Sequence, residues 1–167
     1  MTLATAAGGR VSARIVLLKG VDERGFRFFT NYLSDKGRQV DAQPVVALCF
    51  HWKTLREGVQ VRVEGHVERL PADESDAYFA TRARGSQLGA WASLQSQPLA
   101  DRADFEARLA DAGQRHAGVP VPRPPHWGGF VVRPVRIEFW YGAGFRLHER
   151  QLYECEGGIW RRGMLYP

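Results

Sequence analysis

The segment Arg146-Leu147-His148-Glu149-Arg150 concentrates side chains that could do chemistry. If the segment is a strand, Arg146, His148 and Arg150 share one face, because side chains alternate along a strand. Three adjacent cationic or ionisable groups repel one another unless solvent or an anion offsets their charge. The segment is therefore either a solvated strand edge or a docking face for a phosphate or an electron-rich ring, which a planar guanidinium binds in bidentate or stacked geometry.

A second group of residues has the chemistry of an anion site. Tyr78 and Arg82 are four residues apart and would share one face of a helix. Arg84 and Ser86 follow, and Ser86 is expected to cap the next helix, whose first N–H groups attract anions. Lys36 is a third candidate for binding an anion. The alternative is an ordinary helix–turn–helix with exposed arginines.

Several other motifs are excluded as functional signals. Gly142-Ala143-Gly144 begins like a dinucleotide fingerprint, but it joins two predicted strands and precedes no helix, so a hairpin turn is expected. The histidines show no metal-ligand spacing, and neither do Cys49 and Cys155, so we expect no metal site and no disulfide scaffold. No G-x-S-x-G motif supports a serine hydrolase.

Length and composition are those of one globular domain. The chain has 167 residues, of which 44% are hydrophobic and 25% are charged. Its net charge of +5 is spread along the chain, so nucleic-acid binding is not indicated. No apolar run approaches the roughly 20 residues of a membrane helix, and the N-terminus lacks the pattern of a secretory signal. We expect a single domain over residues 1–167 in a reducing cytoplasm, with no nucleic-acid or membrane partner.

Apolar periodicity and turn signals predict a mainly β fold. Strands are expected at 2–6, 15–18, 26–30, 45–50, 59–68, 129–133, 136–140, 145–153 and 159–165, and helices at 34–41, 72–82, 86–93 and 101–117. The run 45–50 is apolar throughout, which is typical of a strand buried on both faces. The proline-rich segment 119–125 is expected to be an extended loop. These elements amount to a β-barrel or sandwich with helices inserted midway.

Eight motifs occur in one order along the chain. They are Arg14-Ile15-Val16-Leu17-Leu18-Lys19, Phe29-Thr30-Asn31, Gln60-Val61-Arg62-Val63-Glu64-Gly65, Ser86-Gln87-Leu88-Gly89-Ala90-Trp91, Gln95-Ser96, Trp127-Gly128-Gly129, Ile137-Glu138-Phe139-Trp140 and the segment 146–150. Together they closely resemble the pyridoxamine 5'-phosphate oxidase family from end to end. The resemblance implies a homodimeric split β-barrel with FMN at the subunit interface and a C-terminal dimerisation and substrate region at residues 125–167. It also implies oxidation of pyridoxamine or pyridoxine 5'-phosphate to pyridoxal 5'-phosphate, in vitamin B6 metabolism, with O2 reduced to H2O2.

The resemblance also implies roles for individual residues. Flavin contacts would fall to Arg14, Thr30, Lys36, Gln60, Gln95, Ser96, Trp140 and Arg150, and the substrate phosphate to Lys19, Tyr78, Arg82 and Ser86. Arg146 and His148 would be the catalytic residues, holding the pyridine ring against the flavin and assisting proton removal. A hydride would leave the carbon that bears the amine or hydroxyl group and move to the flavin.

The chain departs from the family pattern at a few positions. Asp35 stands where an arginine usually precedes the lysine of the flavin-phosphate pocket. Its carboxylate would either weaken FMN binding or point outward and pair with Arg38. The loop 53–59 is longer than usual, Met164 stands where arginine is common, and the family's N-terminal helical segment is expected to be absent.

Two other functions stay open at this point. A related flavin oxidase could act on another substrate, such as a phenazine precursor, although a substrate without phosphate would leave the charges of Lys19 and Arg82 unpaired. A protein that binds flavin or pyridoxal phosphate with little catalysis is the other alternative, and Asp35 supports it. Turnover of pyridoxamine 5'-phosphate would discriminate among the three.

Overall fold

The computed structural model describes every residue from Met1 to Pro167, and these form two compact units. The first unit comprises Met1–Phe28, Gln39–Glu68 and Val131–Pro167, and the second comprises Phe29–Arg38 and Arg69–Phe130. No helix has the length and apolar character needed to cross a membrane.

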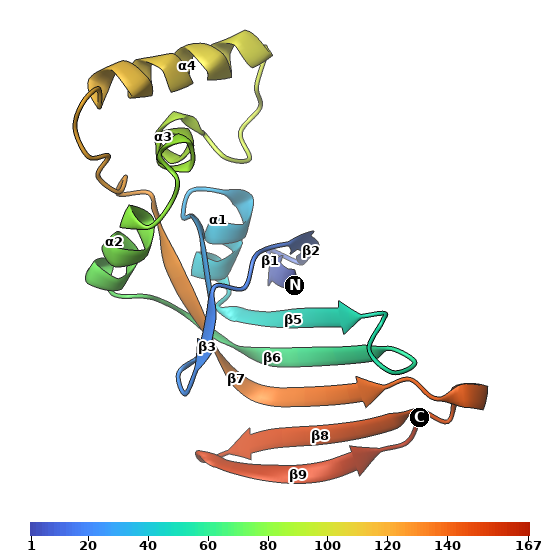
Figure 1. The fold of residues 1–167 in the computed structure, drawn as a ribbon. Helices are drawn as coiled ribbons and strands as arrows, with labels where there is room; N and C mark the ends of the chain where they lie inside the picture. The colour runs from blue at the N-terminus through green and yellow to red at the C-terminus, as the bar shows by residue number, and fades with distance from the viewer. The chain divides into compact units, whose positions relative to one another are not determined.

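The first unit is built on an antiparallel sheet (Figure 1). The strands of the whole chain, of which β4, β6 and β7 have residues in both units, are β1 (Thr2–Ala7), β2 (Arg10–Ile15), β3 (Gly20–Asp22), β4 (Gly25–Asn31), β5 (Val45–Trp52), β6 (Val59–Arg69), β7 (Trp127–Tyr141), β8 (Glu149–Glu156) and β9 (Ile159–Leu165). The strand order is β2-β1-β5-β6-β7-β4-β3, with β8 paired to β7 and β9 paired to β8. The mainly β fold with inserted helices that the sequence predicts is confirmed.

Alternation along β5 and β6 places one face of the sheet on the core. Val63 and Val67 are buried on β6, and Leu48 of β5 lies opposite Val63. The prediction that β5 is buried on both faces is wrong, because Val46 and Leu48 are buried while Val45 is 45% exposed. One covered face is the ordinary arrangement in an antiparallel sheet.

Two predicted strand boundaries also differ from the structure. The strand expected at 15–18 is wrong apart from its first residue: β2 covers Arg10–Ile15 and ends where its only partner, β1, begins at Thr2, and residues 16–18 lie in no strand. The strands expected at 129–133 and 136–140 are one long strand, β7, which runs through Pro134. The turn between β8 and β9 is as predicted: Gly157 and Gly158 have φ of 57° and 82°, which the tight hairpin requires.

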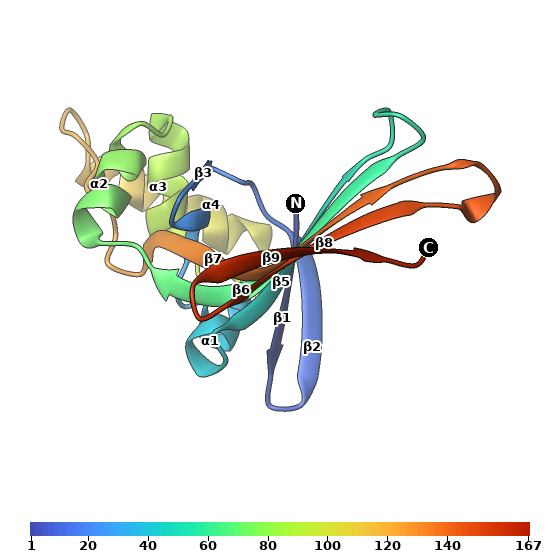
Figure 2. The same cartoon turned by 90° about the horizontal axis from the view of Figure 1, so that it is seen from below.

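The second unit contains α2 (Ala72–Ala80), α3 (Arg84–Ala92) and α4 (Arg102–Arg115), which lie together in Figure 2, and the beginning of α1 (Asp35–Ala42). Asp101 caps α4, as predicted, by accepting a hydrogen bond from the N–H of Ala103 at 2.9 Å. Phe79, Val121 and Trp127 form the core of this unit. The proline-rich segment is an extended loop, and Pro122 accepts a hydrogen bond from the indole of Trp91 at 2.8 Å.

Candidate active site

A cavity of about 280 Å³ lies in the second unit. It is lined by Asn31, Arg82, Ser86, Gly89, Ala90, Ser93, Gln95 and Trp127. Three of these residues, Arg82, Ser86 and Gln95, were predicted to bind phosphate or flavin. The fold therefore brings them to one place from α3 and from the segments after α2 and α3.

The guanidinium of Arg82 lacks a partner for part of its hydrogen-bonding capacity. It lies over the ring of Trp127, 4.6 Å from the ring centroid, and its Nη1 is buried without a hydrogen-bond partner. Burial lowers the pKa of Arg82, and the interaction with Tyr78 acts in the opposite direction. A buried charged donor without an acceptor is unfavourable. This geometry suits the cavity to an anionic group.

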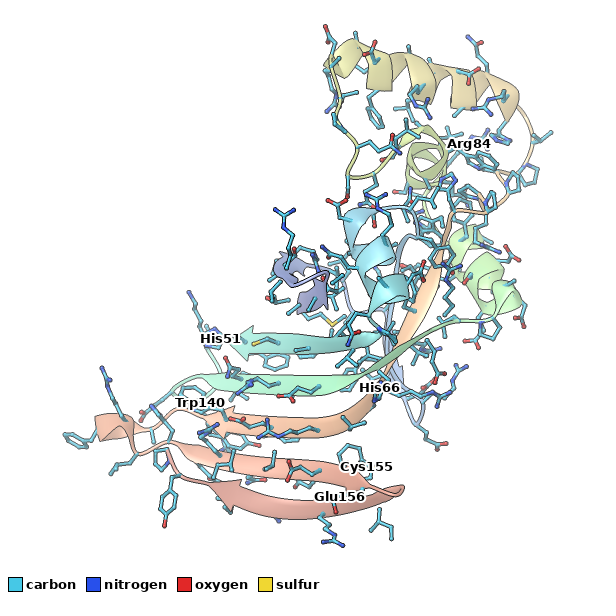
Figure 3. All side chains as sticks on the ribbon, turned by 180° about the vertical axis from the view of Figure 1, so that it is seen from behind. His51, His66, Arg84, Trp140, Cys155 and Glu156 are labelled. Carbon is cyan, nitrogen blue, oxygen red and sulfur yellow. The ribbon has the colours of Figure 1, made fainter.

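The neighbours of Arg82 differ in part from the prediction. Ser86 does not cap α3, because that helix begins two residues earlier with Ala83 as its N-cap, and the N–H of Ser86 donates to the carbonyl of Ala83 at 2.8 Å. Ser86 lies instead in the first turn of α3 and lines the cavity. Arg84, labelled in Figure 3, donates to the backbone carbonyls of His116 and Val119 and does not line the cavity.

Lys36 belongs to a second polar cluster, at the beginning of α1. Its Nζ donates to Thr30 Oγ1 at 3.2 Å and to Ser34 Oγ at 3.4 Å. The Thr30 hydroxyl in turn donates to Gln95 Oε1 at 3.4 Å. The cluster joins residues 65 positions apart in sequence, and it combines a cation with hydroxyl groups at a helix N-terminus, where anions are stabilised.

Asp35 completes this cluster through its backbone and not through its carboxylate. Its N–H donates to Ser96 Oγ at 3.2 Å. Its carboxylate forms an ion pair with Arg38 at 2.6 Å and is 61% exposed. Of the two alternatives for Asp35, the outward pairing with Arg38 is the one that the structure contains.

The first unit holds the remaining predicted residues, among them Arg14. Its Nη1 donates to Thr5 Oγ1 at 2.6 Å and to the Leu3 carbonyl at 3.2 Å, and its Nη2 donates to Gln39 Oε1 at 3.0 Å. These hydrogen bonds fix the direction of the guanidinium. Lys19 lies in the connection between β2 and β3.

Two residues predicted to contact flavin, Gln60 and Trp140, lie near the point where the loop before β6 meets the end of β7. Gln60 is on β6, where its side-chain oxygen lies 3.6 Å from Cys49 Sγ, and Trp140 is near the end of β7 (Figure 3). The long loop before β6 lies against the end of β7, because the N–H of Gly142 donates to the carbonyl of Gly58 at 2.8 Å.

Arg150 is held by a buried carboxylate, that of Glu138, to which no role was predicted. Glu138 is 3% exposed, and it accepts hydrogen bonds from Arg150 Nε at 2.8 Å and from Arg62 Nη1 at 3.3 Å. The hydrogen bond from Arg150 lowers the pKa of Glu138, and the charges of Arg150, Arg62 and Arg136 add to the effect. The same bond raises the pKa of Arg150. A signal was present: Glu138 is the one charged residue in an aromatic and apolar stretch of strand.

Arg146 and His148 do not share a strand face with Arg150, so that prediction is wrong. The strand β8 begins at Glu149, and Arg146 lies before it in a 3₁₀ turn, η1 (Gly144–Arg146), with φ of 63°. The connection from β7 is therefore longer than the hairpin turn expected at Gly142.

His148 is nevertheless held in a defined orientation. Its Nδ1 accepts a hydrogen bond from the N–H of Ala143 at 3.1 Å, and its ring centroid lies 4.6 Å from that of Trp140. Because Nδ1 is the acceptor, the proton of the neutral imidazole is carried by Nε2.

Comparison with known proteins identifies the family. The family model described as pyridoxamine 5'-phosphate oxidase matches residues 1–116, and the model described as the pyridoxine 5'-phosphate oxidase C-terminal dimerisation region matches residues 127–167. The chain belongs to the pyridoxamine 5'-phosphate oxidase family. The resemblance found in the eight motifs is thereby confirmed.

Individual members of the pyridoxamine 5'-phosphate oxidase family are similar along the whole chain. A pyridoxine/pyridoxamine 5'-phosphate oxidase of Myxococcus xanthus strain DK1622 is 61% identical over 168 residues, which is 100% of this chain and 81% of that protein. The protein of the same name from Rubrobacter xylanophilus is 60% identical over 100% of this chain and 76% of its own length.

Two solved structures are similar in fold. PhzG from Burkholderia lata 383, in complex with tetrahydrophenazine-1-carboxylic acid, has a TM-score of 0.92 and 32% identity, over 99% of this chain and 81% of that chain. A pyridoxamine 5'-phosphate oxidase-related, FMN-binding protein from Nostoc punctiforme has a TM-score of 0.78 and 20% identity, over 99% and 87% of the two chains. The second likeness concerns the fold alone.

Proposed function

We propose that this chain is an FMN-dependent oxidase of pyridoxamine 5'-phosphate and pyridoxine 5'-phosphate. The product is pyridoxal 5'-phosphate, and O2 is reduced to H2O2. Relatives that are 56–61% identical over the full chain bear the name of this activity. The observation that carries the proposal is Arg82, whose guanidinium forms no ion pair and which lines the cavity together with Ser86, because a phosphate group there would supply its missing counter-charge.

The polar cluster at the beginning of α1 fits the phosphate of FMN. Lys36 supplies a cation, Thr30 and Ser96 supply hydroxyl groups, and the helix N-terminus adds its own positive potential. The other flavin contacts fall to Arg14, Gln60, Gln95, Trp140 and Arg150. When bound, FMN supplies the hydride acceptor and the route of electrons to O2.

The chain's own residues bind and orient the substrate. Arg82 and Ser86 hold its phosphate, together with Lys19 and Tyr78, and this anchors the molecule through a group that takes no part in the bond changes. Arg146 presents a charged guanidinium on an exposed turn, where it holds the pyridine ring.

His148 is the candidate for orienting the substrate during proton removal. The N–H of Ala143 occupies Nδ1, so Nε2 carries the ring proton and meets the substrate as a hydrogen-bond donor. The proton of the amine or hydroxyl group passes to solvent as the hydride departs, and Trp140 keeps the imidazole ring in place during the step.

The working form that we propose is a cytoplasmic homodimer. The family model over 127–167 describes a dimerisation region. Within this region Phe145 is 99% exposed, Leu147 is 70% exposed and Met164 is 60% exposed, and exposed apolar side chains of this size are typical of an interface. Cys49 and Cys155 are both free thiols, as in proteins of a reducing compartment.

A related flavin oxidase acting on a phenazine precursor is the second candidate. The similarity to PhzG, at 32% identity and a TM-score of 0.92, favours it. A tricyclic carboxylic acid would also offer an anion to Arg82. The third alternative, binding without catalysis, loses the support of Asp35, because that carboxylate is neutralised by Arg38.

The test is the absorption spectrum of the FMN-reconstituted protein during anaerobic addition of pyridoxamine 5'-phosphate. We expect the oxidised flavin band to bleach, and we expect unphosphorylated pyridoxamine to bleach it much more slowly. Bleaching only by a dihydro- or tetrahydrophenazine carboxylic acid would favour the second candidate. A bound flavin that stays oxidised when pyridoxamine 5'-phosphate is added would overturn the proposal.

A further inference from the structure

Four side chains of the second unit form a continuous stack that ends in the cavity. The ring of Tyr78 lies 3.9 Å from that of Phe29 at 19°, and Phe29 lies 5.5 Å from Trp127 at 12°. The guanidinium of Arg82 then lies over Trp127, 4.6 Å from the ring centroid. We call these four residues the aromatic ladder. It joins the two residues predicted to bind phosphate, Tyr78 and Arg82, through two rings that carry no charge.

Trp127 is the fixed member of the ladder. It is 7% exposed and belongs to the core of its unit, together with Val121 and Phe79. The ring of Phe79 meets the indole edge-on, 5.1 Å away at 68°. Close packing on several sides prevents rotation of the indole, so its plane sets the orientation of whatever lies on it.

Arg82 is held by aromatic rings and not by an acid: its guanidinium lies closest to Trp127, and the centroid of the Phe79 ring is 5.4 Å away. No carboxylate forms an ion pair with it, whereas Arg62, Arg123 and Arg150 each have an acidic partner. Its attraction to the face of Trp127 is a cation–π interaction, which is stronger when the pair is shielded from water. A stacked guanidinium directs its N–H groups outward in its own plane. Stacking therefore fixes Arg82 without cancelling its charge, and this charge stays available to an anion in the cavity that Arg82 lines.

We propose that Trp127 is a positioning residue that makes the cavity selective for phosphorylated over unphosphorylated substrates. The proposal rests on the proposed function. A carboxylate in the place of Trp127 would also hold Arg82, but it would cancel the charge that attracts phosphate. The ring holds the guanidinium and leaves its charge intact.

The experiment compares Trp127→Leu and Trp127→Phe with the wild type. Leucine removes the π face, and phenylalanine keeps a weaker one. The readout is the ratio of kcat/KM for pyridoxamine 5'-phosphate to kcat/KM for pyridoxamine. We expect Leu to lower this ratio about tenfold or more and Phe to lower it about threefold, mainly through KM for the phosphorylated substrate.

Val121→Ala is the matched control. Val121 is a buried member of the same core, and it carries no ring on which the Arg82 guanidinium could lie. This variant is expected to lose stability and to keep the ratio. An unchanged ratio in Trp127→Leu, or an equal fall in Val121→Ala, would overturn the proposal. If the Leu variant does not fold, the Phe variant decides: an unchanged ratio there overturns it as well.

Binding of inorganic phosphate separates this proposal from the proposed function. Isothermal titration calorimetry with phosphate alone needs no turnover. If the wild type oxidises neither substrate, the proposed function fails, and the ladder is still tested by the phosphate affinity of the variants. Weaker phosphate binding by Trp127→Leu than by Val121→Ala would support it, and equal binding by both would refute it.

Discussion

Glu138→Gln is expected to lower the free energy of unfolding at neutral pH. The substitution keeps the size of the side chain and an oxygen that accepts from Arg150 Nε, but it removes the negative charge. Glu138 is 3% exposed and is shared by Arg150 and Arg62, at 2.8 Å and 3.3 Å. Both guanidinium groups would lose their buried counter-charge.

The structure sets the size of the effect. A hydrogen bond to a charged group contributes about 1.5–3 kcal/mol, and removal of one partner of a fully buried ion pair costs about 3–5 kcal/mol. The side chains of Arg150 and Arg62 are 27% and 44% exposed, so water compensates for part of the loss. We therefore expect a loss of about 2 kcal/mol, which lowers Tm by about 4–8 °C in a domain of this size.

The pH dependence of this difference follows from the pKa of Glu138. The hydrogen bond from Arg150 lowers this pKa below its ordinary value of 4.5. A carboxyl with a lowered pKa in the folded state contributes stability above its unfolded pKa, and the contribution is lost as the pH falls through the folded pKa. The difference in free energy of unfolding between wild type and Glu138→Gln should be largest near pH 7. It should shrink once the pH falls below the pKa that the carboxyl has in the unfolded state.

The assay is equilibrium unfolding in urea of both proteins without flavin, near pH 7 and at acidic pH. Glu68→Gln is the control, because Glu68 forms an ion pair with Arg133 in which both side chains are about half exposed. That pair should contribute less than about 1 kcal/mol. Equal stability of Glu138→Gln and wild type near neutral pH, or a gap that persists undiminished in acid, would refute the reasoning.

Two further predictions concern the candidate site. Lys36→Met should raise the Kd for FMN about tenfold to a hundredfold in a flavin-fluorescence titration, because a charged hydrogen bond is lost. Arg38→Met is the control: it removes a cation that is already paired with Asp35, so it should change this Kd much less. Equal effects of the two substitutions would contradict the assignment of Lys36 to the FMN phosphate. Arg146→Gln should lower kcat far more than the flavin content of the purified protein, and parallel losses of both would count against a role for Arg146 in substrate orientation.

Local sequence patterns predicted most of the strands and helices, because these elements depend on interactions between residues that are close in sequence. The alternation along β6 identified a strand with one buried face, and Asp101 identified the start of α4. The path of β7 through Pro134 was not predicted, because proline normally interrupts a strand pattern. The turn at Arg146 was missed for a related reason: the chain there leaves the strand while its residue types still alternate.

The candidate site could be predicted only in part, because long-range contacts build it. Lys36 and Gln95 were assigned through the family resemblance, and no local pattern shows that Thr30 joins them. The outward pairing of Asp35 was one of two open alternatives, and the geometry of α1 decided between them. Glu138 was overlooked, since a lone acidic residue in a strand acquires meaning only when the arginines of neighbouring strands are known.

The backbone at Arg146 is strained. Phe145 and Arg146 have φ of 56° and 63°, in the left-handed region that only glycine adopts without strain. Each such residue costs about 1–2 kcal/mol. Glycine at position 146 would relieve this strain. Under the role that we propose for Arg146, the folded state is weakened at this turn to keep a charged side chain beside the substrate, and stability-guided replacement by glycine would yield a molecule that is more robust and less active.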